Sequence, residues 1–324
     1  MPIKIAYLAK VRPDLQARIP KDVDGVILEA GPGGVYSQEA LTKVADVDAF
    51  VISMEPVNEQ ILAAAKKLKI VQRLGVGYET LDLKAAAKRG IPCCNIEGVN
   101  KEAVAEHGIT LALALTKHLL EADKLTREGK WGDSRLLTKT TFELNGKTMG
   151  IIGLGNTGSS LARRCKAFGM KIVYNDTREI DPALVRELDA TSLSKAEIFR
   201  QADIVSVNTD LNETSKLMIN AETLSMMKST ALFVCCARGG IVDEPALRDA
   251  LNAGRIAGAG IDVFDPEPIA KDNPLFSAKN IILTSHIAGV TEETTQRIFE
   301  WAHENVRRVV VNGEKPRWVR NGVN

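Results

Sequence analysis

Short apolar runs alternate with longer segments of helical period along nearly the whole chain. The runs at residues 49–52 (Ala-Phe-Val-Ile) and 70–73 (Ile-Val-Gln-Arg) have the length of buried strands. Between them, residues 58–67 place Ile61 and Leu62 on one face of a helix. Strands that are buried on both faces and alternate with helices are typical of a parallel, doubly wound sheet. The pattern therefore predicts an α/β fold.

The alternation stops once, in a polar segment at residues 126–147. An Ala- and Leu-rich segment before it, residues 102–120, has the period of one long helix, and a second strand–helix array begins at Met149. This interruption predicts two α/β domains, each with a Rossmann-like, doubly wound parallel sheet.

The last part of the chain changes the predicted domain boundaries. Residues 291–311 have helical period, but no strand follows them to extend the second array. We expect this helix to cross back and pack on the first domain. The predicted domains are therefore residues 1–100 together with 291–324, and residues 101–290.

Composition limits the class of protein. The chain has 324 residues, of which 45% are hydrophobic and 26% charged, as is typical of a folded protein with room for two domains. Its formal net charge is only +1. Proteins that bind nucleic acid or anionic membranes usually carry a clustered excess of Lys and Arg. We therefore expect neither nucleic acid nor a membrane as a partner.

The sequence also predicts where the protein works. Residues 1–8 have the pattern of a strand and lack the features of a signal peptide, and the apolar run at 109–120 is too short to span a bilayer. The five cysteines include two adjacent pairs, Cys93–Cys94 and Cys235–Cys236, which do not suit a secreted disulfide framework. The expected location is the reducing cytoplasm.

A glycine motif is the strongest chemical signal. Residues 153–158 (Gly-Leu-Gly-Asn-Thr-Gly) match the G-x-G-x-x-G pattern of dinucleotide-binding turns. An apolar strand at 148–152 leads into the motif, and a helical segment ended by Gly169 follows it. A further strand, 171–174, precedes Asp176, which stands about 20 residues beyond the motif, where an acidic side chain meets the adenosine ribose. This context predicts a dinucleotide site.

Asp176 also predicts which dinucleotide is used. Its carboxylate can accept hydrogen bonds from the ribose hydroxyls, and it would repel the 2′-phosphate of NADP. We therefore predict that NAD is preferred over NADP by at least about tenfold. Arg178, close behind, is a side chain that could accommodate a phosphate instead.

Polar residues follow several predicted strands of the second domain. His118 and His303 fall within helical runs, whereas His286 ends the apolar strand that begins at Ile281. Arg238 and Asp262 also follow strands. Because the carboxyl ends of parallel strands meet at one edge of the sheet, we expect these polar side chains to share the crevice that holds the cofactor.

These residues belong to motifs spread over nearly the whole chain. The motifs are Gly75-Val76-Gly77 with Asp82-Leu83, Val104-Ala105-Glu106-His107, Trp131, the segment 143–148 before the glycine motif, the segment 237–244 (Ala-Arg-Gly-Gly-Ile-Val-Asp-Glu), Asp262-Val263-Phe264 with Glu267-Pro268, and His286-Ile287-Ala288-Gly289. Together they resemble the D-isomer-specific 2-hydroxyacid dehydrogenases. The resemblance implies a flavodoxin-like substrate domain made from both chain ends, a Rossmann NAD-binding domain between them, and a homodimer formed through the NAD-binding domains.

The resemblance also implies roles for individual residues. The catalytic positions are Arg238, Glu267 and His286. The cofactor-binding positions are Gly155, Asn156, Thr157, Asp176, Thr209, Cys236, Ala237, Asp262, Ala288 and Gly289. The substrate-binding positions are Leu74, Gly75, Val76, Gly77 and Arg238, and no metal site is expected.

The chemistry of the three catalytic residues is coherent by itself. Arg238 offers a planar fork of donors that can hold a carboxylate and polarise a carbonyl group. Reduction of a 2-oxo acid also needs a proton donor, and an imidazole, with an ordinary pKa of about 6.5, can supply the proton from His286. Glu267, if hydrogen-bonded to the other ring nitrogen, would set the tautomer and stabilise the imidazolium form. We predict an NAD-dependent oxidoreductase that interconverts a small 2-oxo acid and a D-2-hydroxy acid.

The size and charge of the substrate can be predicted as well. The strand at 49–52 leads into Ser53-Met54-Glu55-Pro56, which supplies no cation and carries a carboxylate. A second anionic group on the substrate would then stay unpaired, which is costly in a partly desolvated pocket. We expect glyoxylate, hydroxypyruvate or a short apolar 2-oxo acid to react far better than 3-phosphohydroxypyruvate.

Two other functions are compatible with the same residues. One is an NAD(H)-binding corepressor or sensor of this fold, although the interaction tails of such proteins are not evident here. The other is a dehydrogenase of an inorganic anion such as phosphite. The formate-oxidising branch is disfavoured because it carries Gln where Glu267 stands.

Overall fold

The computed structural model describes residues 2–10 and 13–323. The chain folds into two compact units, one of residues 1–99 with 291–324 and one of residues 100–290. The sequence predicts domains of 1–100 with 291–324 and of 101–290, and the functions assigned to these domains stay predictions.

The described residues of the first unit form a parallel sheet with the strand order β2-β1-β3-β4-β5. Its strands are β1 (Ile3–Leu8), β2 (Val23–Leu28), β3 (Ala49–Ile52), β4 (Ile70–Arg73) and β5 (Cys93–Cys94). Its helices are α1 (Pro13–Ala17), the short 3-10 turn η1 (Pro32–Gly34), α2 (Gln38–Lys43), α3 (Glu59–Ala64), α4 (Leu83–Lys88) and α13 (Glu292–Val310).

Strand β3 shows why this sheet is apolar on both faces. Phe50 and Ile52 pack on one face, in a core shared with α2, α3 and α4. Ala49 and Val51 pack on the other face, where Val306 of α13 joins the core. Because successive side chains of a strand point to opposite faces, a continuous apolar run is what such a sheet requires. The prediction of an α/β fold is confirmed for this unit.

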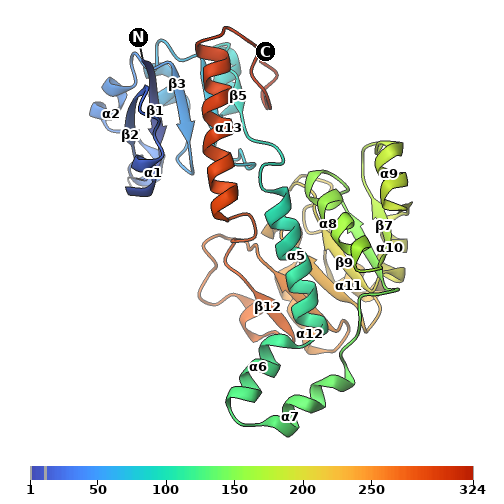
Figure 1. Cartoon of the computed structure of the whole chain (residues 1–324). Helices are drawn as coiled ribbons and strands as arrows, with labels where there is room; N and C mark the ends of the chain where they lie inside the picture. Colours follow the sequence, from blue (N-terminus) through green and yellow to red (C-terminus); the bar gives the residue numbers. More distant parts are fainter. Residues whose placement is uncertain (1, 11–12, 324) are drawn as a thin grey trace. The chain divides into compact units, whose positions relative to one another are not determined.

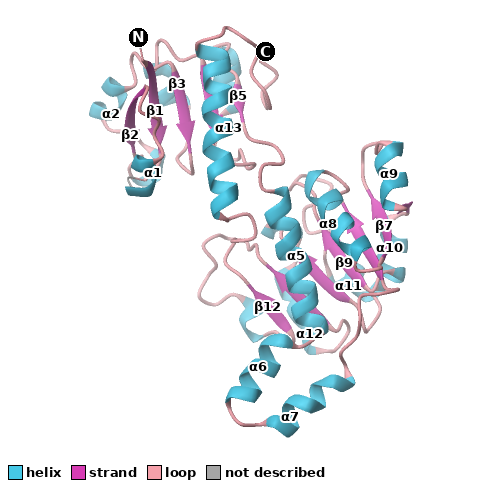
Figure 2. Ribbon diagram, in the orientation of Figure 1, coloured by secondary structure: helices cyan, strands magenta, loops and turns pink. Residues whose placement is uncertain are grey.

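The described residues of the second unit form a parallel sheet, whose strands are magenta in Figure 2. The strand order is β12-β11-β10-β9-β6-β7-β8. Its strands are β6 (Thr148–Ile152), β7 (Lys171–Asn175), β8 (Thr191–Ser192), β9 (Ile204–Val207), β10 (Leu232–Cys235), β11 (Gly258–Ile261) and β12 (Ile281–Leu283). Its helices and 3-10 turns are α5 (Lys101–Thr116), α6 (Leu119–Arg127), α7 (Trp131–Leu136), η2 (Leu137–Lys139), α8 (Asn156–Ala167), α9 (Pro182–Leu188), α10 (Lys195–Gln201), α11 (Ala221–Met226), η3 (Gly239–Ile241), α12 (Glu244–Asn252) and η4 (Pro274–Ser277).

Helices cover both faces of this second sheet. Helices α5 and α8 share one core with it, and α10, α11 and α12 share the core on the other face. All strand pairs are parallel, so the loops that follow β6, β7, β9, β10, β11 and β12 leave from the same edge. The predicted catalytic and cofactor residues lie on these loops or at the start of α8.

The prediction of one helix over residues 102–120 is wrong. Helix α5 ends at Thr116, and α6 begins at Leu119 after His118, which has a left-handed backbone (φ 49°). His118 therefore breaks the helix, and its location within a helix is also wrong. The polar segment that follows contains α7, which packs against α6, and the two project from the sheet as an arm (Figure 1). Helical period continues through both helices, so the pattern alone could not reveal the change in direction.

Among residues 2–10 and 13–323, no helix combines the length and the apolar character needed to cross a membrane.

Candidate active site

The glycine motif forms a tight turn between β6 and α8. Gly153 has a positive φ of 94°, and a Cβ at this position would lie 2.7 Å from the carbonyl oxygen of Asn208. A Cβ on Gly158 would lie 2.0 Å from the carbonyl oxygen of Gly153. Larger residues would therefore push the turn and the helix apart. The first helical residues, Asn156 and Thr157, present their N–H groups at a helix N-terminus, which is a favourable place for a pyrophosphate.

Asp176 lies at the end of β7, beside this turn. One carboxylate oxygen accepts a hydrogen bond from the N–H of Leu154 at 2.9 Å, and the other accepts one from the N–H of Arg178 at 2.9 Å. The guanidinium of Arg178 also pairs with the same carboxylate, at 3.1 Å. Burial opposes ionisation of Asp176, but the hydrogen bonds from Arg178 hold the pKa of this carboxyl below its usual value.

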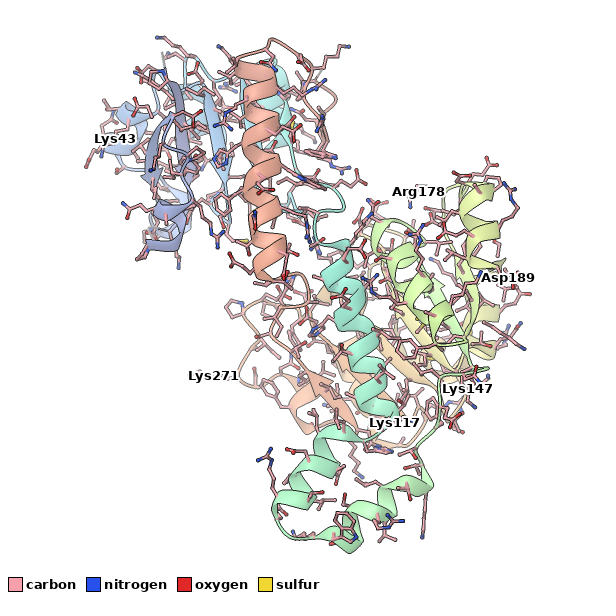
Figure 3. All side chains as sticks on the ribbon, in the orientation of Figure 1. Lys43, Lys117, Lys147, Arg178, Asp189 and Lys271 are labelled. Carbon is pink, nitrogen blue, oxygen red and sulfur yellow. The ribbon has the colours of Figure 1, made fainter. Side chains whose placement is uncertain are left out.

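The sequence did not predict that Arg178 would pair with Asp176. The guanidinium approaches within 3.1 Å of the point where a Cβ on Gly155 would stand, so it lies against the glycine turn near α8 (Figure 3). The Asp176 side chain is only 5% exposed, whereas that of Arg178 is 64% exposed. The Asp176 carboxylate, which is expected to bind ribose, is therefore already paired with the charge of the largely exposed Arg178 side chain.

The predicted proton donor has the expected partner. The ring Nδ1 of His286 lies 2.6 Å from Oε2 of Glu267, and the other oxygen of Glu267 accepts a hydrogen bond from the N–H of Phe264 at 3.0 Å. Both side chains are partly exposed, His286 by 48%. If Nδ1 carries the hydrogen shared with Glu267, the remaining ring nitrogen, Nε2, is the atom that can give a proton to a substrate.

Asp262 holds the turn that carries His286. Its buried carboxylate accepts hydrogen bonds from the hydroxyl of Thr284 (2.6 Å) and from the N–H groups of Ile287 (3.0 Å) and Ala288 (2.9 Å). His286 itself has a positive φ of 55° and donates its N–H to the carbonyl of Asp262 at 2.7 Å. These bonds explain how His286 is kept in a conformation that is uncommon for residues other than glycine. A contact of Asp262 with the cofactor stays a prediction.

Arg238 follows β10, next to the strand that leads to Glu267. Its guanidinium donates to the carbonyl of Ala237 at 2.8 Å. A Cβ on the neighbouring Gly239 would lie 2.0 Å from the carbonyl group of Phe264. Glycine at this position therefore lets the loop of Arg238 close against the loop that carries Glu267, and the three predicted catalytic residues come from the ends of the adjacent strands β10, β11 and β12.

Sequence reasoning missed a buried clamp on the loop of Glu267. The Glu244 side chain, at the start of α12, accepts hydrogen bonds from the N–H of Asp265 at 3.1 Å and from the amide of Asn273 at 2.5 Å. Glu244 and Asn273 are both buried. The only sequence signal was that Glu244 ends the motif beginning at Ala237, and this gave no indication of its target.

The other predicted cofactor residues differ in their exposure. Gly155, Asn156, Thr157, Thr209, Cys236, Ala237 and Gly289 all keep some accessible surface, and Ala288 is buried. A Cβ on Gly289 would lie 2.6 Å from the side-chain nitrogen of Asn100, so the two residues are close neighbours. All these residues lie in the second unit, and their contacts with a cofactor stay predictions.

Apart from Arg238, the predicted substrate-binding residues lie in the first unit, on the loop after β4. The N–H of Leu74 donates to the carbonyl of Ile52 at 2.7 Å, and Gly75 has a positive φ of 127°. The carbonyl of Gly75 accepts a hydrogen bond from the N–H of Ile96 at 2.8 Å, and that of Val76 accepts one from the Asn95 amide at 2.7 Å. The loop backbone is therefore held at several points.

A comparison with protein families identifies the family to which the chain belongs. The model for the D-isomer specific 2-hydroxyacid dehydrogenase NAD-binding domain matches residues 109–288. The chain belongs to this family. The predicted resemblance and the predicted fold class, two parallel-sheet α/β domains with a Rossmann NAD-binding fold, are confirmed.

Individual relatives agree with this assignment. A glyoxylate reductase from Korarchaeum cryptofilum is 38% identical over 268 residues, which cover 82% of this chain and 80% of that protein. The holo structure of D-mandelate dehydrogenase from Rhodotorula graminis covers 100% of this chain and 99% of its own, with 26% identity and a TM-score of 0.88. An NADPH-dependent glyoxylate/hydroxypyruvate reductase from Sinorhizobium meliloti, solved with citrate, covers 99% and 98%, with 28% identity and a TM-score of 0.83.

This 2-hydroxyacid dehydrogenase is therefore an oxidoreductase that interconverts a small 2-oxo acid and a 2-hydroxy acid with a nicotinamide cofactor. The prediction of an enzyme of this class is confirmed, and a corepressor or an enzyme of inorganic anions is not favoured.

Proposed function

We propose that this enzyme reduces glyoxylate or a similarly short, singly charged 2-oxo acid, with Arg238, Glu267 and His286 as its catalytic residues. The contact of 2.6 Å between His286 and Glu267, on a partly exposed pair, is the observation that carries the proposal. It is the arrangement that a general acid needs, because the carboxylate orients the ring and stabilises its charged form.

The chain's residues fit the two roles that the reaction leaves to the protein. A bound reduced nicotinamide supplies the hydride that is added to the carbonyl carbon. Arg238 binds the substrate carboxylate and polarises the carbonyl group with its planar donors. The Nε2 of His286 then gives its proton to the carbonyl oxygen, and the exposed ring regains a proton from water. The glycine turn, Asn156 and Thr157 would hold the pyrophosphate.

The preference for a singly charged acid has support in the first unit. Glu55, after β3, accepts a hydrogen bond from the N–H of Ala30 at 3.2 Å. Arg73 of the neighbouring strand does approach this loop, with its guanidinium 3.2 Å from the sulfur of Met54. Arg73 also donates to the carbonyl of Leu74 at 2.6 Å, so some of its N–H donors are already used by the backbone. A substrate phosphate would compete with these contacts.

A comparison of substrates tests this proposal. Glyoxylate, hydroxypyruvate, pyruvate and 3-phosphohydroxypyruvate would each be assayed with NADH at one pH. We expect kcat/KM to be highest for one of the three unphosphorylated acids. A higher kcat/KM for the phosphorylated acid would overturn the preference, and inactivity toward all four would overturn the proposed substrate class.

We also propose that NADH is the preferred cofactor and that Asp176 binds its adenosine ribose. The pairing with Arg178 makes this choice sensitive to one side chain, because a guanidinium released from Asp176 could meet a 2′-phosphate. The kcat/KM ratio of NADH to NADPH, measured at saturating 2-oxo acid, tests the preference.

The arm formed by α6 and α7 supports the predicted homodimer. Neither helix buries a side chain within the described part of the chain, and Leu119, Leu120, Trp131 and Leu136 are each more than half exposed. A cavity of about 320 Å³ lies where α5 meets α6, between His118, Leu120 and Phe142 among others. Exposed apolar surface of this kind is typical of an interface.

We propose that a second copy of the chain covers this arm. Trp131→Asp should convert a dimer into a monomer in sedimentation experiments, because it places a charge on the apolar surface. Val311→Asp is a matched control, since Val311 is similarly exposed (63%) but lies in the first unit. A dimer that survives Trp131→Asp would place the interface elsewhere.

A further inference from the structure

In the loop Leu74–Gly77, the backbone carbonyls and the backbone N–H groups differ in their hydrogen bonding. The carbonyls of three successive residues are all taken: Leu74 accepts from the Arg73 guanidinium (2.6 Å), Gly75 from the N–H of Ile96 (2.8 Å) and Val76 from the amide of Asn95 (2.7 Å). By contrast, no described residue accepts a hydrogen bond from the N–H groups of residues 75–77.

The bonded carbonyls determine the direction in which the N–H groups of this loop point. In a trans peptide the C=O of one residue and the N–H of the next point in opposite directions. When the carbonyls of Leu74, Gly75 and Val76 are drawn into the protein, the N–H groups of the three following residues are turned the other way. Consecutive backbone N–H groups that are left available in this way are suited to bind an anion such as a carboxylate.

The third of these carbonyls is held by a relay from the end of the chain. Asn95 donates from Nδ2 to Val76, and its Oδ1 accepts a hydrogen bond from the Arg320 guanidinium at 2.9 Å. Asn95 is buried (1% exposed), so this charged partner decides which end of its amide faces the loop. Arg320 also binds the carboxylate of Glu97 at 2.9 Å and lies over the ring of Tyr78 at 5.7 Å.

The segment that carries Arg320 is itself docked on the sheet. Val319 forms an antiparallel bridge with Cys94, and the N–H of Arg320 donates to the carbonyl of Cys93 at 2.8 Å. Nearby, the buried amide of Asn305 in α13 donates to Gln72 at 2.7 Å, and Gln72 donates to the carbonyl of Asn95 at 3.0 Å. The loop is thus tied to both α13 and the C-terminal segment through buried amides.

We propose that Arg320 is a positioning residue for substrate binding, which acts through Asn95 to turn the N–H of Gly77 toward the substrate carboxylate. This inference rests on the proposed role of residues 74–77 as a carboxylate anchor. In this positioning role, Arg320 contacts neither the reacting atoms nor the cofactor. Its loss should therefore weaken binding of the 2-oxo acid and leave the binding of NADH unchanged.

The test compares variants of the full-length enzyme by steady-state kinetics with glyoxylate at saturating NADH. Arg320→Ala should raise the KM for glyoxylate at least about fivefold, with kcat and the KM for NADH changed less than about twofold, since a charge-assisted hydrogen bond is lost on the substrate side alone. Arg320→Lys should restore part of the affinity, because an ammonium group can still donate to Asn95.

Arg317→Ala is the matched control. Arg317 lies in the same segment, and its side chain pairs with the exposed Glu304 at 2.9 Å, while its backbone holds Asn305. This substitution removes an equal charge without touching the relay, so its KM for glyoxylate should stay within twofold of the wild type. Thermal unfolding of each variant reports whether the fold is kept.

The outcomes distinguish a failure of the proposed substrate class from a failure of the proposed role of Arg320. A wild-type enzyme that does not reduce glyoxylate, hydroxypyruvate or pyruvate overturns the proposed substrate class and is detected before any variant is made. An unchanged KM in Arg320→Ala, or an equal rise in Arg317→Ala, overturns the role of Arg320. If Arg320→Ala does not fold, Arg320→Met decides, because it keeps an apolar side chain beside Tyr78 but has no donor for Asn95. A KM within twofold of the wild type then contradicts the proposal, and a larger rise supports it.

Discussion

The two units present their functional groups in opposite ways. In the second unit the proposed reactive groups are side chains, and buried carboxylates hold the backbone beneath them: Asp262 binds the turn of His286, and Glu244 binds the loop of Glu267. In the first unit the candidate groups are backbone N–H groups, and side-chain amides such as Asn95 hold the loop from behind. A motif search recognises the side-chain site of the second unit much more readily, because only in that unit does the chemistry depend on the residue type.

The largest effect is expected when the proposed proton donor of the second unit is replaced. His286→Gln should lower kcat for 2-oxo acid reduction by about 100-fold or more, the usual scale for the loss of a general acid. NADH binding, measured by fluorescence titration, should stay within about twofold of the wild type. Turnover near the wild-type rate would exclude His286 as the proton donor.

The next prediction concerns the first unit, where a histidine serves the fold instead of the reaction. His303 in α13 is 5% exposed and lies 2.7 Å from the hydroxyl of Tyr7, and burial lowers its pKa to about 4. The charges of Arg307 and Asp22 act on the ring as well, in opposite directions. His303 therefore stays neutral in the folded protein well below the pH at which it is protonated in the unfolded chain.

This difference destabilises the fold in acid. The folded pKa is lower than the unfolded value of 6.5, so the unfolded state binds more protons as the pH falls. Between pH 7 and pH 5 the free energy of unfolding should fall by about 2 kcal/mol from this residue. Urea unfolding at both pH values measures the change, and His303→Gln, which keeps an acceptor for Tyr7 and cannot titrate, should reduce it. Equal pH dependence in the variant would contradict the prediction.

A smaller effect is expected for cofactor choice. The wild type should prefer NADH over NADPH by at least about tenfold, or 1.4 kcal/mol. Arg178→Ala should increase this preference further, since it removes the guanidinium beside Asp176 and leaves the carboxylate to repel a 2′-phosphate. Arg163→Ala on α8, which breaks the exposed pair with Glu187 of α9, is the control and should leave the ratio unchanged. Equal use of both cofactors by the wild type would show that Arg178, not Asp176, sets the choice.

The smallest effect concerns the coupling of Glu267 to His286. Glu267→Gln removes the negative charge that stabilises the imidazolium, so the proton donor is charged only at lower pH. The pH optimum for reduction should therefore move to lower pH. An unchanged pH–rate profile would mean that the contact at 2.6 Å has no part in proton transfer.

Several features of the site could not be predicted from local sequence. The pair of Asp176 and Arg178 depends on how one flexible side chain folds back over the glycine turn. The relay from Arg320 to Asn95 joins residues 225 positions apart, and no periodicity or motif signals such a contact. The break at His118 was missed because helical period continues on both sides of it.

The amino-acid sequence by itself determined the fold class, the glycine turn and the candidate catalytic residues. It could do so because buried parallel strands need continuous apolar runs, and because a parallel topology brings the ends of those strands to one edge, where Arg238, Asp262 and His286 stand. Only the tertiary structure decided which groups hold those residues in place. A buried carboxylate such as Asp262 or Glu244 has several possible donors within a folded chain, and packing, which depends on every neighbouring side chain at once, selects among them.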